Sequence, residues 1–213
     1  MRRRKKPGSE EKLLSKDKLV VAEPERYKGT WHTYFQQKGE IHVEIGTGRG
    51  QFLTTMAERN PHINYVGIEM KEEVLLQAVI KAEEKKLQNI AFLWLDANRL
   101  TEIFEDSELQ RMFINFCDPW PKNRWAKRRL TYRGFLEIYK NLLAASGEIH
   151  FKTDNAKLFE FSLNEFSHCD FQLKKITFDL HQSDLQENIT TEYEDKFVQM
   201  GKPIYRCEAR KRN

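Results

Sequence analysis

Short apolar segments alternate with helical patterns along most of this chain, and each apolar segment ends on polar or glycine residues. The first segment, Ile41 to Ile45, is followed by Gly46-Thr47-Gly48-Arg49-Gly50 and then by apolar residues at helical spacing. Further segments of the same kind follow at residues 65–68, 90–95, 112–116 and 148–151. This alternation predicts a parallel sheet that is covered by helices on both faces.

The last third of the chain predicts two more strands, at residues 171–180 and 204–209, with residues 192–200 between them. The expected fold is therefore α/β and Rossmann-like, with a seven-stranded, mostly parallel sheet. A chain of 213 residues is long enough to bury about 70% of its unfolded surface around one core. We expect residues 26–213 to form that single domain.

Residues 1–25 are charged, poor in aromatic side chains and interrupted at Pro7-Gly8 and at Pro24. They begin with a basic cluster from Arg2 to Lys6. We expect a flexible basic N-terminal arm with at most one short amphipathic turn near residues 13–19. The arm is either a solvated tail or a segment that folds over bound nucleic acid, and the sequence leaves both open.

The cysteines and histidines show none of the spacings that hold a disulfide framework or a metal ion. Cys117, Cys169 and Cys207 are odd in number and far apart, which indicates a reducing compartment. No apolar run approaches the ~20 residues that span a bilayer, and no secretory signal follows the basic cluster. The sequence predicts a cytoplasmic protein without a membrane segment or a bound metal.

The glycine loop after the first strand and the acid after the second predict an adenosine cofactor. Gly46, Gly48 and Gly50 let the backbone come close to a ligand at the carboxyl ends of the strands. Glu69, which ends the second strand, is placed to accept hydrogen bonds from two ribose hydroxyls. The glycines alone also fit a tight strand-to-helix turn that binds nothing.

The charges around this loop favour S-adenosylmethionine over a dinucleotide. The loop is one residue shorter than the dinucleotide fingerprint Gly-x-Gly-x-x-Gly. Glu44 precedes it, and a carboxylate there would repel a pyrophosphate but attract an ammonium, which S-adenosylmethionine carries. At the end of the third strand, Asp96 and Asn98 are suited to the exocyclic amine and ring nitrogens of an adenine.

The fourth strand runs into the stretch from Phe116 to Arg129, which places an acid, two prolines and two indoles ahead of a run of cations. Asp118 begins the run Asp118-Pro-Trp-Pro. An Asp-Pro turn is common in any protein. At this strand end, however, class I methyltransferases of exocyclic amines carry Asn or Asp before Pro-Pro-aromatic, and Asp118 is similar to that residue. The difference in sequence suggests a different target atom.

The cations after Asp118 are either the solvated start of a helix or a surface for RNA. They are interleaved with indoles, and stacking of a base on an aromatic ring contributes roughly 1–3 kcal/mol. Each neutralised phosphate of a single strand adds about −0.7 to the salt slope of binding. The side chains in question are Lys122, Arg124, Lys127, Arg128 and Arg129, with Trp120 and Trp125 among them.

Two further motifs have two open interpretations each. Asp154, after the fifth strand, either caps the following helix or contacts substrate. Thr191-Glu192-Tyr193-Glu194 has the spacing of a capping box, with Glu194 three residues after Thr191, and it too either caps a helix or contacts substrate.

Together these motifs resemble those of the bacterial tRNA (guanine-N7)-methyltransferases, a family of class I methyltransferases. The resemblance covers the chain from about Tyr27. Two positions depart from the family pattern, since Cys117 stands where proline is usual and Trp125 where histidine is usual. The motifs that carry the resemblance are Glu44-Ile-Gly-x-Gly-x-Gly50, Gly67-Ile-Glu69, Asp96-Ala-Asn98, Asp118-Pro-Trp-Pro-Lys122, Arg124, Lys127-Arg-Arg129, Lys152-Thr-Asp154 and Thr191-x-Tyr-Glu194.

The resemblance implies transfer of a methyl group from S-adenosylmethionine to a guanosine in the tRNA variable loop, giving 7-methylguanosine and S-adenosylhomocysteine. It implies tRNA as partner and Asp118 as the catalytic residue. It places Glu44, Glu69, Asp96 and Asp118 at the cofactor or its surroundings. It places Lys122, Asp154 and Thr191 to Glu194 at the substrate. Whether the protein is a monomer or a homodimer stays open.

Three rival functions remain at this point. They are a methyltransferase for another RNA position or for a protein, an RNA-binding subunit without turnover, and a nicotinamide oxidoreductase. The intact glycine loop with Glu69 and Asp118 argues against a subunit that binds no cofactor.

Overall fold

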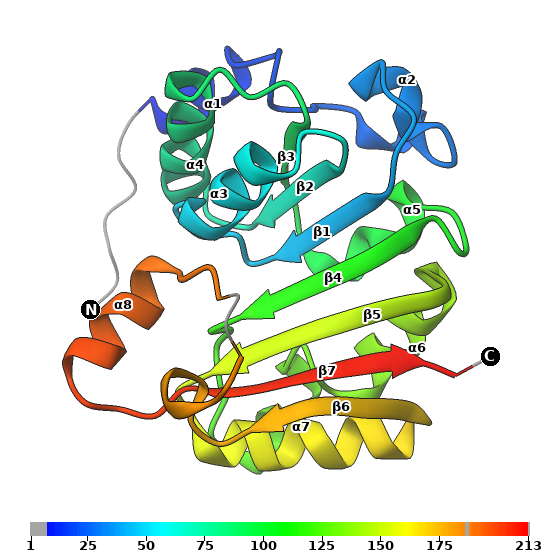
Figure 1. Ribbon diagram of the computed structural model, residues 1–213. Coiled ribbons are helices and arrows are strands. Elements are labelled where there is room, and N and C mark those ends of the chain that lie inside the picture. The colour runs from blue at the N-terminus through cyan, green and yellow to red at the C-terminus, as the bar shows by residue number, and fades with distance from the viewer. Residues whose placement is uncertain (1–7, 186–187, 213) are drawn as a thin grey trace.

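A computed structural model describes residues 8–185 and 188–212 of the chain. Within them a seven-stranded sheet runs through the molecule in the order β3-β2-β1-β4-β5-β7-β6 (Figure 1). Neighbouring strands are parallel from β3 to β5, and β7 pairs antiparallel with both β5 and β6. The prediction of a mostly parallel, seven-stranded sheet is confirmed. The strands are β1 (Ile41–Ile45), β2 (Asn64–Glu69), β3 (Ile90–Trp94), β4 (Leu109–Asn115), β5 (Leu143–Thr153), β6 (Phe171–Thr177) and β7 (Tyr205–Lys211).

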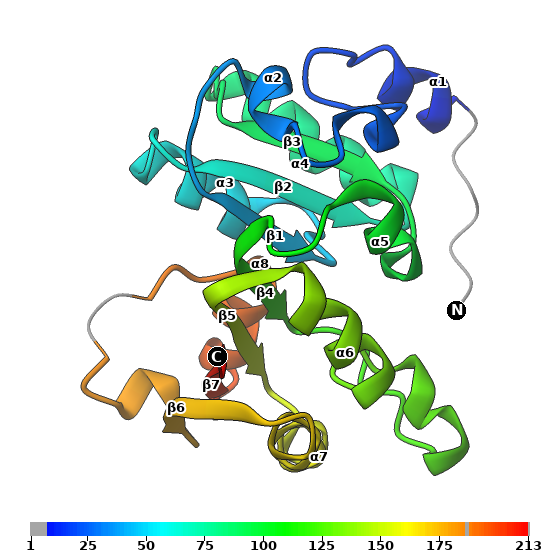
Figure 2. The ribbon, with the colours of Figure 1, turned by 90° about the vertical axis from the view of Figure 1, so that its right-hand side faces the viewer.

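Helices cover both faces of the sheet, because alternate residues of each strand point to opposite sides. On β1, Val43 packs into one apolar cluster, whereas Phe113 on the neighbouring β4 packs into the other with α3 and α4. Helices α6 and α7 lie on the side of the first cluster (Figure 2). The helices are α1 (Ser9–Leu14), α2 (Trp31–Phe35), α3 (Gln51–Arg59), α4 (Glu72–Glu84), α5 (Leu100–Ile103), α6 (Arg133–Leu142), α7 (Ala156–His168) and α8 (Glu192–Gln199).

The segment before Pro24 differs from its prediction as a flexible arm. Leu13 on α1 is fully buried, and Val20 forms a parallel bridge with Phe92 of β3. The amide of Phe92 donates to the carbonyl of Leu19 at 2.7 Å. Residues 8–25 are therefore packed on the domain, because a few apolar side chains among the charges give them a buried face. Residues 1–7 of the predicted arm lie outside the described residues.

Several strand boundaries differ from their predictions, among them the start of β4, at Leu109 instead of residue 112. β5 begins at Leu143, directly after α6, and so is longer than the predicted segment at residues 148–151. β6 ends at Thr177 instead of continuing to Leu180, because the carboxylate of Asp179 accepts a hydrogen bond from the amide of His181 and starts a 3-10 turn. Such side-chain caps compete with a continuing strand.

No helix in the described part of the chain has the length and apolar character needed to cross a membrane.

Candidate active site

The parallel strands β3, β2, β1, β4 and β5 end at one edge of the sheet, and the predicted site residues follow these ends (Figure 1). In open α/β sheets this edge is where ligands bind. The glycine loop follows β1, Glu69 ends β2, Asp96 follows β3 and Asp118 follows β4. The fold thus brings the predicted cofactor acceptors and Asp118 to one edge.

The glycine loop leaves open space at its first two glycines. All three glycines have positive φ values, and a Cβ added at Gly46 would meet no atom within 4 Å. A Cβ at Gly48 would meet only the carbonyl oxygen of Gly46, at 3.9 Å. At Gly50 a Cβ would lie 2.6 Å from the Cβ of Ala78 on α4. Gly46 and Gly48 therefore expose backbone for a ligand, while Gly50 permits the close packing of α3 on α4.

Glu69 is held beside this loop by backbone amides. Its Oε1 accepts from the amides of Met70 at 2.9 Å and Lys71 at 3.0 Å, and its Oε2 accepts from the amide of Gly48 at 3.3 Å. A carboxylate has about four acceptor sites, and these three amides leave capacity on Glu69 for a further donor such as a ribose hydroxyl. The geometry fits the predicted role of binding ribose hydroxyls.

Asp96 and Asn98 form one unit at the end of β3. Oδ1 of Asp96 accepts from both the backbone amide of Asn98, at 2.8 Å, and its side-chain Nδ2, at 2.6 Å. These contacts orient the carboxylate and use one of its two oxygens. The arrangement fits the prediction that Asp96 accepts from an adenine amine, with Asn98 holding the carboxylate in place.

Glu44 is buried and hydrogen-bonded on both oxygens. Oε1 accepts from Nδ2 of Asn115 at 2.8 Å, and Oε2 accepts from Oγ1 of Thr47 at 2.7 Å. Burial raises the pKa of Glu44 to about 7, against the effect of these hydrogen bonds and of the nearby Lys152. The carboxylate therefore sits in a low-dielectric site where a cationic ligand would favour its charged form.

Asn115 was missed by the sequence reasoning. It ends β4 beside Glu44, it is buried, and its Oδ1 has no hydrogen-bond partner in the described structure. A buried acceptor without a partner is costly unless something binds to it. Together with Glu44 it forms an acceptor pair that fits the ammonium of S-adenosylmethionine. The only sequence signal was a polar residue directly after the apolar run from Met112 to Ile114.

Lys152 was also not singled out, although it lies in a quoted motif. It is buried on β5, and its ammonium donates to Oε2 of Glu194 at 2.7 Å and to the carbonyl of Ile189 at 2.9 Å. Burial lowers the pKa of Lys152, and the attraction of Glu194 opposes that shift. These contacts join the end of β5 to the first turn of α8 and to the segment before it.

Asp118 is exposed in a loop whose backbone is held in an unusual shape. Phe116 and Trp120, on either side of it, have φ values of 52° and 41°. The left-handed region costs a non-glycine residue about 1–3 kcal/mol, and such strain concentrates at functional sites. The amide of Phe116 donates to the carbonyl of Lys152 at 2.8 Å, which ties the loop to β5.

Arg129 corrects one of the predicted RNA contacts. It is buried, and its guanidinium donates to the carbonyl of Pro119 at 3.2 Å and to that of Trp120 at 3.0 Å. It also lies over the ring of Phe161, 4.2 Å from the ring centre. Because its donors point into the protein, Arg129 braces the Asp118 loop and does not face a polyanion.

The remaining predicted cations are exposed, and Lys122, Arg124 and Arg128 lie over indoles. The ammonium of Lys122 lies 5.0 Å from the ring centre of Trp125, and the guanidinium of Arg128 lies 5.0 Å from that of Trp120. The two indoles meet edge to face, with ring centres 5.9 Å apart. The cations after Lys122 belong to a 3-10 turn, η3 (Asn123–Arg128), instead of a regular helix start, and Lys122 is the N-cap residue of that turn. The exposed cations of this surface are Lys122, Arg124, Lys127 and Arg128.

The two motifs with open interpretations are resolved differently. Asn155, and not Asp154, caps α7, by accepting from the amide of Leu158. The capping interpretation of Asp154 is therefore wrong. Thr191 does cap α8, accepting from the amide of Glu194 at 3.0 Å. The carboxylate of Glu194 does not complete a capping box, because it turns inward to Lys152.

Tyr193 is the exposed residue of its motif, and it continues an aromatic row. Its ring stacks on Phe197 with centres 6.4 Å apart, and Phe197 stacks on Phe116 at 6.2 Å. The exposed fraction of Tyr193 is 61%. The row therefore runs from a residue two positions before Asp118 to the surface of α8.

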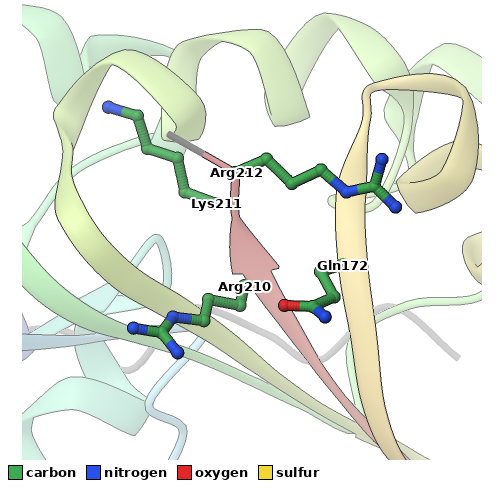
Figure 3. Close-up of a pocket in the computed structure, with 4 residues that line it drawn as sticks. All are labelled: Gln172, Arg210, Lys211 and Arg212. Atoms are coloured by element: carbon green, nitrogen blue, oxygen red, sulfur yellow. The ribbon is translucent and has the colours of Figure 1, made fainter.

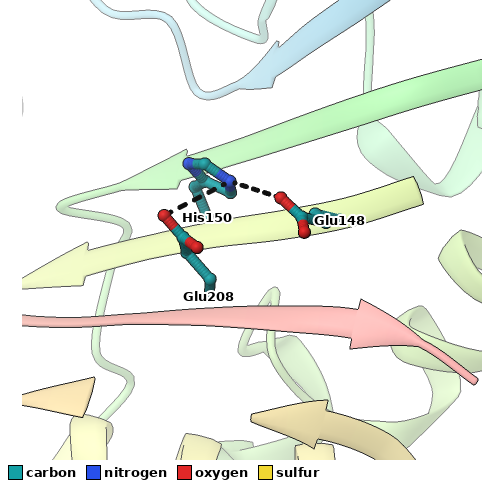
Figure 4. Close-up of side chains that lie close together, drawn as sticks. All are labelled: Glu148, His150 and Glu208. Carbon is teal, nitrogen blue, oxygen red and sulfur yellow. Dashed lines mark hydrogen bonds and ion pairs between the residues drawn. The ribbon is translucent and has the colours of Figure 1, made fainter. Parts of the chain in front are cut away.

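Two other polar groups lie away from these strand ends. Glu148, His150 and Glu208 face one another across β5 and β7 (Figure 4). Lys175 and Arg206 pair with Glu208, an arrangement typical of an ion-pair network. A shallow basic pocket is lined by Gln172, Arg210, Lys211 and Arg212 near the C-terminal end of β7, which runs antiparallel and so ends at the opposite edge (Figure 3).

Known proteins resemble this chain closely. Residues 38–207 match the family model described as "Putative methyltransferase". A tRNA (guanine-N(7)-)-methyltransferase of Clostridioides difficile (strain 630) is 57% identical over 100% of both chains. One of Brevibacillus brevis (strain 47) is 52% identical over 98% of both. The solved structure of the 16S rRNA methyltransferase KamB aligns with a TM-score of 0.65 at 11% identity, covering 87% of this chain and 94% of that one.

Proposed function

This chain belongs to the family of tRNA (guanine-N(7)-)-methyltransferases, and on that premise we propose that its strand-end site methylates a guanine in the variable loop of tRNA, with Asp118 at the reaction centre. The resemblance read from the motifs is confirmed, as is the class I methyltransferase fold. The protein is an S-adenosylmethionine-dependent tRNA (guanine-N7-)-methyltransferase. The variable loop and the residue roles below are proposals.

The residues at the strand ends fit the parts of S-adenosylmethionine. Glu44 and the unpartnered Oδ1 of Asn115 hold the ammonium, and Glu69 holds the ribose hydroxyls. Asp96 accepts from the adenine amine, with Asn98 as its support. Bound there, the cofactor supplies an electrophilic sulfonium methyl group. The open backbone at Gly46 gives the room that such a ligand needs.

Asp118 orients and stabilises the guanine instead of removing a proton. N7 of guanine carries an in-plane lone pair and no proton, so no general base is needed for its attack. Positive charge develops on the purine as N7 is methylated, and a fixed carboxylate stabilises it or accepts from guanine N1 and N2. Correct positioning of two reactants can lower a barrier by about 7–11 kcal/mol, which suits a braced and strained loop.

The tRNA is held by the exposed cations after Asp118 and by α8. Lys122, Arg124, Lys127 and Arg128 form a surface with two indoles, on which phosphates and unpaired bases are both accommodated. Tyr193 offers an exposed ring on the other side. Asp154 stays a proposed substrate contact; its Oδ2 lies 4.0 Å from the ammonium of Lys202. We place the enzyme in the cytoplasm with its substrate, in agreement with its free cysteines.

One observation carries this proposal. The loop that holds Asp118 runs directly from the strand end beside Glu44 to the exposed cations of η3, so a single loop links the cofactor acceptors to the RNA surface. The test is transfer of labelled methyl from S-adenosylmethionine to unmodified tRNA, followed by digestion and mapping of the label. We expect 7-methylguanosine in the variable loop. Label on an adenine, or on a guanine elsewhere, would contradict the proposal.

A further inference from the structure

We propose that Lys152 and Glu194 are positioning residues that hold the RNA-contacting end of α8 against the cofactor site, and that Glu194 itself does not touch tRNA. The inference rests on the proposed function. The family resemblance assigned the segment Thr191 to Glu194 as a whole to substrate contact. The inference leaves Tyr193 as its outward residue, with Thr191 and Glu194 turned inward and Glu192 paired with Lys81.

The carboxylate of Glu194 is completely buried and already satisfied. Oε2 accepts from the ammonium of Lys152 at 2.7 Å, and Oε1 is hydrogen-bonded to Nε2 of His181 at 2.9 Å and to Nδ2 of Asn188. A tRNA group could reach Glu194 only by breaking these contacts. That would leave the charge of Lys152 buried without a partner, which is strongly unfavourable.

Lys152 also holds the residues just before α8. Its ammonium donates to the carbonyl of Ile189 at 2.9 Å and to Oδ1 of Asn188 at 3.1 Å. Asn188 therefore uses both ends of its amide, one on Lys152 and the other on Glu194. The buried ion pair and this amide fix residues 188–194 to the carboxyl end of β5.

Side chains from three elements, β5, α3 and α4, hold the first turn of α8. Besides the buried pair, Nε2 of Gln51 donates to Asp195 at 2.9 Å, and Lys81 of α4 pairs with Glu192 at 2.7 Å. Gln51 directly follows Gly50 of the glycine loop. In Figure 1, α8 lies beside the ends of β4 and β5, as these contacts require. Of these three contacts, the Lys152–Glu194 ion pair is the buried one.

These contacts orient Tyr193. Since Thr191 caps the helix and Glu194 is anchored inside, the residue between them on the outer face is Tyr193. Its ring rests on Phe197, which stacks on Phe116 of the Asp118 loop. The buried pair thus sets the position of an RNA-facing ring relative to the reaction centre.

Lys152 also acts on the cofactor carboxylate. It lies over the ring of Phe52, 5.2 Å from the ring centre, and its charge stabilises the ionised form of Glu44. The negative charge of Glu192, which is paired with Lys81, disfavours ionisation of Glu44. Neutral hydrogen bonds from Asn115 and Thr47 favour it. Removing Lys152 must therefore raise the pKa of Glu44.

The test is a double-mutant cycle of Lys152→Met, Glu194→Gln and the double variant, with dissociation constants for tRNA and for S-adenosylmethionine measured separately. If the pair positions the segment, each single variant and the double variant weaken tRNA binding to a similar degree, about tenfold, because either change breaks the same contact. Glu194→Gln leaves S-adenosylmethionine affinity within twofold. The double variant removes both buried charges and so retains the fold even if a single variant does not.

The pH profile supplies a readout that loss of structure alone would not produce. In the double variant, the midpoint of S-adenosylmethionine binding against pH moves to higher pH than in wild type or Glu194→Gln. A Glu194→Gln effect on tRNA binding that adds fully to that of Lys152→Met would show direct contact with RNA and overturn the proposal. Unchanged tRNA affinity in the double variant would do the same. Failure of the proposed function would appear separately, as absence of methylated tRNA with the wild-type enzyme.

Discussion

Glu44 and Asn115 share a buried hydrogen bond of 2.8 Å between Oε1 and Nδ2, although 71 residues separate them in the sequence. The amide fixes the direction of the carboxylate and presents its own unpartnered Oδ1. Two acceptors from neighbouring strands are thereby preorganised, so a cationic group that binds there meets them without rearrangement.

Replacement of Asn115 by alanine is expected to weaken S-adenosylmethionine binding by about tenfold or more. A hydrogen bond to a charged group contributes about 1.5–3 kcal/mol, and the variant loses both the orienting donor and the free acceptor. Isothermal titration calorimetry measures the change. Gln110→Ala is a matched control, because Gln110 offers its side-chain oxygen to the amide of Ile41 at the other end of the same strand. Equal affinities of Asn115→Ala and wild type would contradict the acceptor pair.

Cofactor affinity and stability should respond to pH with opposite signs. Burial raises the pKa of Glu44 from 4.5 to about 7, so the folded protein without ligand binds a proton that the unfolded chain has lost. The stability that Glu44 contributes is present below pH 4.5 and is lost as pH rises through about 7. Affinity for an ammonium instead increases from pH 6 to pH 7.5, because the ionised carboxylate binds it.

Calorimetry with S-adenosylmethionine at several pH values, and thermal unfolding of the protein alone, measure the two trends. The range stops at pH 7.5 because α-amino groups begin to lose their proton near pH 7.7–8.0. Glu44→Gln should flatten both curves. A Glu44→Gln protein that keeps the full pH dependence of binding would assign it to another group.

Asp118→Ala is expected to lower turnover by at least about 100-fold, the usual effect of removing one fixed group that stabilises transition-state charge. S-adenosylmethionine affinity should change little, because Glu44, Glu69 and Asp96 remain. Single-turnover methylation at saturating tRNA and cofactor measures the chemical step. Asp106→Ala, an exposed acid in the turn before β4, is the control. Wild-type turnover in Asp118→Ala would refute the site.

Neighbouring arginines should behave differently. Arg128→Ala is expected to weaken tRNA binding and to flatten the plot of log affinity against log salt by about 0.7, the value for one phosphate contact with a single strand. Arg129→Ala should leave that slope unchanged and lower the free energy of unfolding by about 2 kcal/mol, because its hydrogen bonds to the carbonyls of Pro119 and Trp120 are lost. A changed slope in Arg129→Ala would place that side chain on the RNA.

Tyr193→Ala is expected to weaken tRNA binding by about 1–3 kcal/mol, the contribution of one stacked base. Tyr193→Phe keeps the ring and should bind within twofold of wild type. Filter binding at constant salt distinguishes these outcomes. If both variants lose affinity equally, the hydroxyl and not the ring makes the contact.

The sequence predicts those parts of the site that follow from short patterns of neighbouring residues. The limits of β1, the glycine loop, and the acids at the ends of β2 and β3 follow from short patterns, and the parallel topology places them at one edge. Arg129 could not be separated from its neighbours, because a run of cations does not show which one a 3-10 turn directs inward. The sequence predicts an arm for residues 1–25, although residues 8–25 pack on the domain, because their few apolar side chains are diluted by charge.

Asn115 and Lys152 depend on long-range contacts. Each is a polar residue near the end of a strand, which by itself indicates only that the strand ends there. Their partners, Glu44 and Glu194, lie 71 and 42 residues away. Their roles follow from pairing across strands and from burial, and neither is visible in the spacing of a motif.

The place of β7 in the sheet has a consequence for biosynthesis. It is the last described strand, yet it lies between β5 and β6 and is the only described strand that pairs with β6. While the ribosome is still translating residues 205–211, β6 has no partner, although the strands from β3 to β5 are already complete. This part of the sheet can therefore close only once residues 205–211 are available, and a product truncated before them would expose the free edges of β5 and β6 to aggregation.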